Sequence, residues 1–256
     1  MWKSIQHSYN VITYKASADL KSEVRRFYIS YLWWVFGPTM EMVVFYVIFD
    51  LLLHRGTDNF IPFLLVGVTA WNWFGSTTIH CASSIVNSRA LMQQACIHKS
   101  LFPIIVICTD TFKFLIAFAV VIIVLWACGL PPNFQCVYLP LIFMTQLFFI
   151  AAVGMICAGI TPFFQDFSVL LNYIIRVMFF VSGIFYDAKS ISADVRFYFF
   201  LNPMARLISS YRDVLIHGQR PDIAPLFALM AVSVFVAMLG WLFIDKHDKV
   251  YPRILF

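Results

Sequence analysis

Four ionisable side chains lie inside otherwise apolar stretches of the sequence, where a charge is costly and usually faces a bundle interior or a wet cavity. They are Glu41, Asp110, Lys113 and Arg176. Asp110 and Lys113 are three residues apart, so they share one helix face and are expected to form a structural ion pair. A buried arginine needs an acidic or carbonyl partner, and Glu41 or Asp110 could serve Arg176. For Glu41, a functional role and a plain hydrogen bond to a neighbouring helix are both open.

The sequence lacks the motifs of a catalyst or of an ion-coupled pump. It contains no GxxxxGK[ST], HExxH or GxSxG motif, and its six histidines include no pair spaced as metal ligands. We therefore expect no catalytic residue, no metal site and no cofactor in this chain. A polytopic enzyme that modifies a lipid-linked glycan would need clustered acids or a His–Asp pair at a membrane face. A channel or secondary transporter would show internal repeats or a ring of like charge.

The composition indicates an integral membrane protein. Of the 256 residues, 61% are hydrophobic and 12% are charged, whereas an ordinary soluble domain carries about twice that charge. The formal net charge of +5 does not indicate nucleic-acid binding, because the excess lies in short segments beside apolar runs, where it sets membrane topology. The cysteines show no ligand-like spacing and are typical of small apolar residues. Cys128 and Cys136 flank one outward turn, so a disulfide between them is one option.

The hydrophobic pattern predicts an all-α polytopic membrane protein, with residues 1–256 as a single transmembrane domain and six transmembrane helices. Residues 1–26 have the pattern of an amphipathic helix lying in the membrane interface, or alternatively packed on a soluble partner. Residues 186–222 contain apolar runs too short to cross, which predicts re-entrant or interfacial helices before the last span. Gly154 and Gly159 would permit close helix approach in the fourth span. The spans are expected at residues 27–53, 60–79, 104–126, 137–160, 168–185 and 223–244.

The loop between the second and third spans is the segment around which the chain is organised. Its sequence, residues 87–103, is NSRALMQQACIHKSLFP, with Arg89 and Lys99 and no acidic residue. A short basic loop between spans is cytoplasmic by the positive-inside rule, which also places both termini in the cytoplasm. Because the chain has no ATP site, this loop is where an outside force would enter.

Three stretches, in order around the predicted spans, resemble the ABC-2 type permeases, in particular those that export bacterial capsular polysaccharide and lipopolysaccharide O-antigen. YISYLWWVFGP resembles the family's entry to span one, and NSRALMQQACIHKSLFP resembles its loop with Asn, Leu and then Phe-Pro before span three. FLNPMARLISSYRDVLIHGQRPD resembles its Asn-Pro, Arg and Gly-x-x-Pro before the last span. The chain departs from the family at Met92, Gln93 and Gln94, where lysines are frequent, and at Gly183, where many relatives have proline.

The resemblance implies a permease subunit in the bacterial inner membrane, assembled as a homodimer with two separate cytoplasmic ATP-binding subunits that hold ATP and Mg. Residues 87–102 would be a cytoplasmic coupling helix seated in a groove of the ATPase. The cargo would be a long glycan on a lipid anchor, with teichoic acid or a small drug as alternatives. The residues that would carry the coupling contact are Asn87, Arg89, Leu91, Gln94, His98 and Lys99.

Aromatic and basic side chains are the candidates for the substrate path. Sugar rings have apolar faces, so aromatic rings could line a conduit, although an interfacial or lipid-facing position is equally open for each of them. Three arginines, Arg176, Arg206 and Arg212, could meet an anionic phosphate or an acidic sugar, or be paired structurally. The aromatic candidates are Trp33, Trp34, Trp71, Trp73, Phe179, Phe180 and Tyr186.

Overall fold

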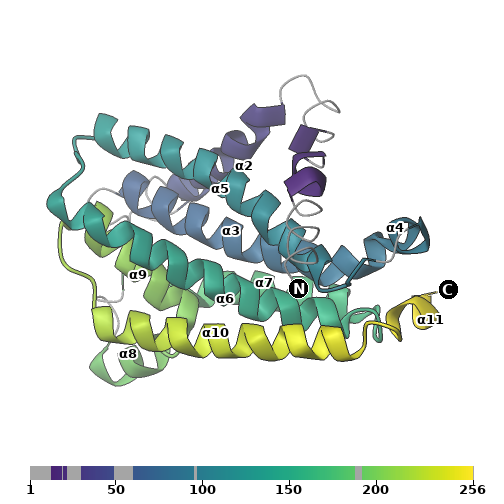
Figure 1. The fold of residues 1–256 in the computed structure, drawn as a ribbon. Helices are drawn as coiled ribbons and strands as arrows, with labels where there is room; N and C mark the ends of the chain where they lie inside the picture. The colour runs from purple at the N-terminus through teal and green to yellow at the C-terminus, as the bar shows by residue number, and fades with distance from the viewer. Residues whose placement is uncertain are drawn as a thin grey trace.

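The computed structural model describes residues 13–18, 20–21, 30–48, 60–94, 97–187 and 192–255 (Figure 1). Over these ranges the chain is all-helical, without any strand, as the hydrophobic pattern predicts. Most of the expected interface helix at residues 1–26 lies outside the described residues, so that expectation stays a prediction.

Six long helices fall on the six segments expected to span the membrane. Within the part of the chain that the structure describes, three stretches are long and apolar enough to cross a bilayer by length and composition, namely Leu101–Ala127, Phe134–Ile160 and Ile223–Lys246. The fifth predicted span is a shorter apolar helix, Phe167–Val181. The six helices are α2 (Ser30–Tyr46), α3 (Phe60–Asn87), α5 (Leu101–Ala127), α6 (Leu139–Ile160), α7 (Phe167–Val181) and α10 (Ile223–Lys246).

Short helices lie at the two ends of the long ones. At one end, α4 (Arg89–Gln94) packs near the C-terminal α11 (Tyr251–Leu255), and at the other lie α8 (Ala193–Phe199), α9 (Pro203–Leu215) and the 3-10 helix η2 (Phe134–Tyr138) (Figure 1). The predicted break at Asn202-Pro203 begins α9, because the Asn202 side chain accepts a hydrogen bond from the Met204 N–H at 3.0 Å. Cys128 and Cys136 are both free thiols, so the optional disulfide is not formed.

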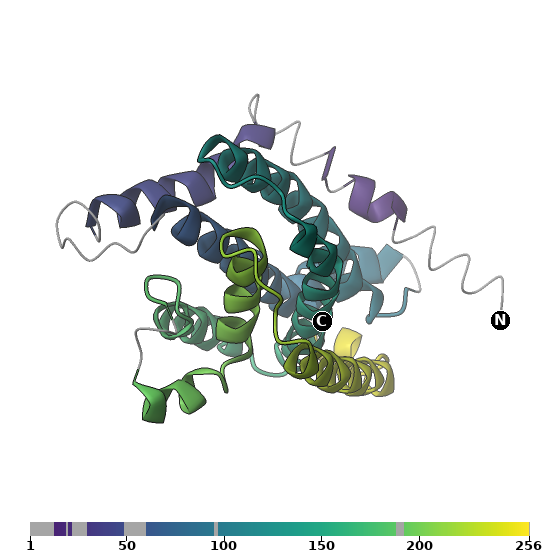
Figure 2. The ribbon, with the colours of Figure 1, turned by 90° about the vertical axis from the view of Figure 1, so that its left-hand side faces the viewer.

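Helix α3 is the centre of the packing. It has 28 residues, of which 20 are buried, and it packs against α2, α5, α6, α7 and α9. Helix α10 packs mainly on α6, so that α2 and α10 lie on opposite sides of the bundle (Figure 1 and Figure 2). Helix α3 is therefore buried between two sides of the bundle. Helices α6 and α10 form one side, and α2 lies on the other.

Glycines bring α6 and α10 together, as expected for the fourth span. A Cβ added at Gly159 would lie 2.8 Å from Phe243 Cδ1, and one added at Gly240 would lie 2.8 Å from Met155 Cβ. A Cβ at Gly154 would lie 3.0 Å from Cys81 Sγ on α3. Lipid chains are as apolar as the helices, so no hydrophobic effect drives the helices together. Close backbone packing is therefore a main source of attraction between them.

We predict that Gly240→Ala destabilises the protein, because the new methyl group overlaps Met155 and forces α10 away from α6. The expected loss is about 1–3 kcal/mol of unfolding free energy, the usual range for overpacking. Thermal unfolding of the purified protein in detergent measures it. Gly37→Ala is the matched control, because nothing lies within 4 Å of a Cβ at Gly37. Equal melting temperatures for the two variants would show that the α6–α10 contact is loose.

Candidate functional site

A polar stripe runs along α3. The three residues of this helix that are exposed, Ser76, His80 and Asn87, are all polar, and Asn72 and Ser83 lie half-buried between or beside them. The intervals of four, four, three and four residues put all five on one helix face. Elsewhere α3 is buried against other helices or presents only half-buried isoleucine and valine. A helix that shows polar groups on its one open face is suited to border water rather than lipid.

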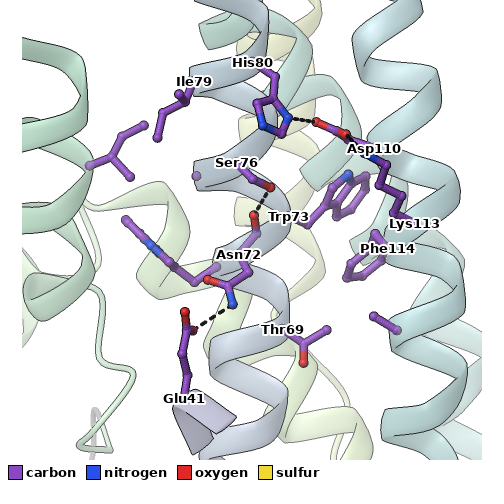
Figure 3. Close-up of a pocket in the computed structure, with 14 residues that line it drawn as sticks. Glu41, Thr69, Asn72, Trp73, Ser76, Ile79, His80, Asp110, Lys113 and Phe114 are labelled. Atoms are coloured by element: carbon purple, nitrogen blue, oxygen red, sulfur yellow. Dashed lines mark hydrogen bonds and ion pairs between the residues drawn. The ribbon is translucent and has the colours of Figure 1, made fainter. Parts of the chain in front are cut away.

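A pocket of about 510 Å³ lies beside this stripe, between α2, α3, α5 and α7. Figure 3 shows Asn72, Ser76 and His80 in a column along α3, with Glu41 entering from α2 and Asp110 and Lys113 from α5. The pocket therefore gathers three of the four ionisable residues that the apolar stretches contain. The remaining lining residues include the aromatic side chains of Trp71, Trp73 and Phe114.

Glu41 makes the contact that joins α2 to the stripe. The Asn72 side-chain amide donates a hydrogen bond to Glu41 Oε2 at 2.9 Å. Ser76, one turn further along α3, directs its hydroxyl to the carbonyl oxygen of Asn72. Glu41 is exposed in the described chain, so its carboxylate keeps one oxygen available at the mouth of the pocket.

Asp110 forms the expected ion pair with Lys113 and also contacts His80. Lys113 Nζ lies 3.3 Å from Asp110 Oδ1, and His80 Nδ1 lies 2.7 Å from Oδ2. The pairing proposed for Arg176 is wrong, because neither Glu41 nor Asp110 contacts it and Arg176 is exposed on α7. The two acids have other partners. Glu41 accepts from the Asn72 amide, and Asp110 contacts Lys113 on its own helix and His80 on α3.

The His80–Asp110 contact does not make a catalytic triad. A triad needs a nucleophile whose proton the histidine can take. On the face of α3 that carries His80, the hydroxyls of Ser76 and Ser83 donate to backbone carbonyl oxygens instead. The second Asp110 oxygen is held by Lys113. Among the described residues no group of three His, Cys, Asp or Glu side chains could hold a metal ion. The arrangement holds the carboxylate of Asp110 between a lysine and a histidine beside the polar stripe.

Two of the aromatic path candidates are core residues. Trp73 is 3% exposed, and its ring stacks on those of Phe114 and Phe143, with centroids 4.1 Å and 5.0 Å apart. Trp71 is buried too and packs edge-on against Phe179 at 5.8 Å. These rings form the wall behind the pocket. Both side chains are buried in this structure, and their role as a gliding surface for sugar rings stays a prediction.

The other aromatic candidates are more open. Phe180 is exposed on α7, and Phe179 and Tyr186 are half-buried. Tyr186 donates its hydroxyl to the carbonyl oxygen of Phe180 at 3.3 Å. Trp33 and Trp34 lie within α2, but their side chains are outside the described part of the structure.

Arg212 has a structural role, the alternative to anion binding that the sequence left open. It is 5% exposed, and its guanidinium donates to the carbonyl oxygens of Phe63, Gly183 and Ile184 at 2.6–3.2 Å. It thereby ties α9 to the start of α3 and to the turn after α7. The turn needs Gly183, whose φ of +70° is rarely adopted by other residues.

Arg206 keeps a more accessible position at the same end. Its guanidinium lies 5.2 Å from the centre of the Phe200 ring and donates to the Phe200 carbonyl oxygen at 3.4 Å. With Arg196, Phe197 and Leu201 these residues line a pocket of about 280 Å³ at the elbow between α8 and α9. A contact of Arg206 with an anionic group stays a prediction.

The basic loop contains a short helix that projects at one end of the bundle (Figure 1). Arg89 and Leu91 lie on α4 and are half-buried, and Asn87 is the exposed last residue of α3. Gln94 ends α4, with its side chain outside the description. His98 and Lys99 follow and face acidic residues of the C-terminal segment, Asp245 and Asp248. The loop itself has no acid, so its partners had to come from elsewhere in the chain.

Comparison with known proteins places the chain in a family. Its sequence matches the ABC-2 type transporter family over residues 16–216. The chain belongs to that family and is a transporter permease.

Several curated relatives have similar length and sequence. The O-antigen export system permease protein RfbA of Myxococcus xanthus is 28% identical over 218 residues, which are 84% of each chain. The protein of the same name from Klebsiella pneumoniae is 25% identical over 216 residues, covering 84% of this chain and 83% of the relative. The polysialic acid transport protein KpsM of Escherichia coli is 21% identical over 231 residues, or 87% of each chain.

We predict that Asp110→Ala destabilises the protein because it leaves Lys113 without its carboxylate partner. The expected loss is about 2 kcal/mol, below the ~3–5 kcal/mol of a fully buried pair, since Lys113 is partly exposed. The double variant Asp110→Ala/Lys113→Met should recover at least half of this loss. Unfolding of the purified protein in mixed micelles measures both. If the double variant is less stable than the single one, the ion pair is not what Asp110 contributes.

Arg212→Lys should destabilise the end of the bundle that holds α9. A single ammonium cannot reach three carbonyl oxygens, and each buried acceptor left unpaired costs ~1–3 kcal/mol, so we expect a loss of about 3 kcal/mol. Arg206→Lys, at a half-buried arginine with one long hydrogen bond, should cost much less. Thermal unfolding of the two variants side by side tests this, and similar melting temperatures would contradict the structural role of Arg212.

Proposed function

We propose that this chain is the membrane permease subunit of an ATP-driven exporter that moves a lipid-linked polysaccharide, an O-antigen or capsular glycan, across the bacterial inner membrane. In this proposal the six long helices cross the membrane and the segment at residues 186–222 is re-entrant on the outer side. Both termini are cytoplasmic. The functions of the relatives, which export O-antigen and transport polysialic acid, support this cargo. The absence of a phosphate-binding loop in the sequence implies that ATP and Mg bind to another subunit.

The observation that carries the proposal is the polar face of α3. A hydrophilic polymer needs a path on which hydroxyl groups can exchange hydrogen bonds with the wall, because lipid offers none. Asn72, Ser76 and His80 provide donors and acceptors at successive turns, and Glu41 and Asn72 are linked at one end of that column. A small apolar drug would not require such a face, so the stripe favours a glycan cargo over that alternative.

A second copy of the chain would complete this path. The pocket is formed by α2, α3, α5 and α7 of one chain, and α7 buries only Leu171 and Ile175 in that chain. In the proposed homodimer the stripes of the two copies face each other across a shared conduit. The projecting loop with α4 seats in an ATP-binding subunit, and closure of the ATPase pair drives the opening.

Ser76→Phe tests the path directly. A phenyl ring on the stripe would make an apolar constriction, and such constrictions exclude water, so glycan export should fall about tenfold or more. Surface glycan is measured in cells whose only permease is the variant, with the co-purified ATP-binding subunit quantified in parallel. Val232→Phe is the matched control, because Val232 is exposed on α10, away from the stripe.

The exporter proposal is supported if Ser76→Phe blocks export while the ATP-binding subunit still co-purifies. Normal export by Ser76→Phe would remove α3 from the path. If the unaltered chain binds no ATP-binding subunit and moves no glycan, the proposed function itself fails.

A further inference from the structure

The residue that ends the basic loop is held by the far end of the chain. The backbone N–H of Lys99 donates to Asp248 Oδ1 at 2.8 Å, and Lys99 Nζ donates to Asp248 Oδ2 at 3.1 Å. One residue thus occupies both oxygens of a carboxylate that lies 149 positions away in sequence. The two side chains are only 12% and 22% exposed, so water screens this pair less than a surface ion pair.

A separate apolar cluster lies beneath this contact. It joins the last turns of α3 and the first turns of α5 to α6, α10 and α11, through buried residues that are far apart in sequence. Tyr251 fills its centre and donates its hydroxyl to the Gly159 carbonyl oxygen at 3.2 Å. Burial, together with the Asp248 carboxylate, raises the pKa of Tyr251, which keeps that hydroxyl protonated. The buried members are Ile85, Phe102, Met155, Ala158, Ile244 and Tyr251.

The surface around this contact is basic. Lys246, Lys249 and Arg253 are exposed on the C-terminal segment, and Lys99 neutralises Asp248. His98 Nδ1 lies 3.6 Å from Asp245 Oδ1. Together with Arg89 on the adjacent α4, these residues present positive charge at the end of the bundle where the loop projects (Figure 1). Such a surface suits a protein partner with an acidic face.

We infer that the coupling element has two parts, the loop with α4 and the C-terminal segment 245–255, and that Lys99 and Asp248 are positioning residues that join them. This inference rests on the proposed function and names a second contact for the ATP-binding subunit. A push on α4 then reaches α10 directly as well as α3 and α5. Because α10 is held to α6 by glycine contacts, the same push is shared with that flank of the bundle.

A double-mutant cycle tests the inference in the assembled transporter. Lys99→Met keeps the backbone N–H, and Asp248→Asn keeps an oxygen to accept from it, so each variant removes only the ion pair. In membranes containing the permease with its ATP-binding subunit, we expect either variant to lower glycan exported per ATP hydrolysed about threefold or more, as for changes along a packed coupling network. The double variant should be no worse than either single one. Arg220→Met is the control, since Arg220 is an exposed basic residue before α10, at the opposite end of that helix from Asp248. Lys249→Met, on the proposed binding surface, tests separately whether charge alone matters there.

The inference is overturned if the single variants export as efficiently per ATP as the unaltered chain, or if their losses multiply in the double variant. If Lys249→Met also loses the ATP-binding subunit, the positive charge of this surface explains the binding, and the contact between Lys99 and Asp248 does not. A failure of the unaltered chain to bind any ATP-binding subunit would instead remove the proposed function, and the inference with it. Co-purification of the subunit with each variant separates these results.

Discussion

A helix in a bilayer can be enclosed by its neighbours only if its polar groups find partners among them or open onto water. Helix α3 meets most of this constraint in two ways. On its packed sides most residues are apolar or small, apart from buried threonine hydroxyls without a hydrogen-bond partner among the described residues, and where α6 passes close to it the contact is made at Gly154. On its remaining side the residues are polar, and their charged neighbours Glu41, Asp110 and Lys113 are engaged with an amide or with each other. The position of α2, α5 and α7 around this helix follows from that division.

The existence of the long helices was predictable, because runs of apolar residues longer than a bilayer is thick leave few alternatives. The i, i+3 pairing of Asp110 and Lys113 was also predictable, because helix geometry places these two residues on one face. The partner of a buried arginine was not. Arg212 is buried and bonds to three carbonyl oxygens, although its segment is polar enough to be expected near the surface. Arg176 lies in a more apolar run, yet its side chain is exposed. Burial here is decided by which face of a helix meets its neighbours.

The polar stripe was within reach of the sequence, since Asn72, Ser76 and His80 recur every four residues. This polar repeat was obscured by the tryptophans on either side of Asn72, which suggest sugar-binding residues but are buried. The contact between Lys99 and Asp248 was not predictable, because no local pattern relates a loop to a tail 149 residues later. What the sequence did contain was a loop without acids and a tail whose basic residues are accompanied by two acids, Asp245 and Asp248.

The shallow burial of α7 sets how the bundle can deform. Only Leu171 and Ile175 of that helix are buried, whereas α6 and α10 meet through glycines at near-backbone contact. Displacing α7 therefore disturbs few packed side chains, while separating α6 from α10 disturbs many. Within one chain, α6 and α10 are tightly packed and α7 is lightly packed. A passage that must admit a bulky polymer can therefore widen by moving α7 while α6 and α10 stay together.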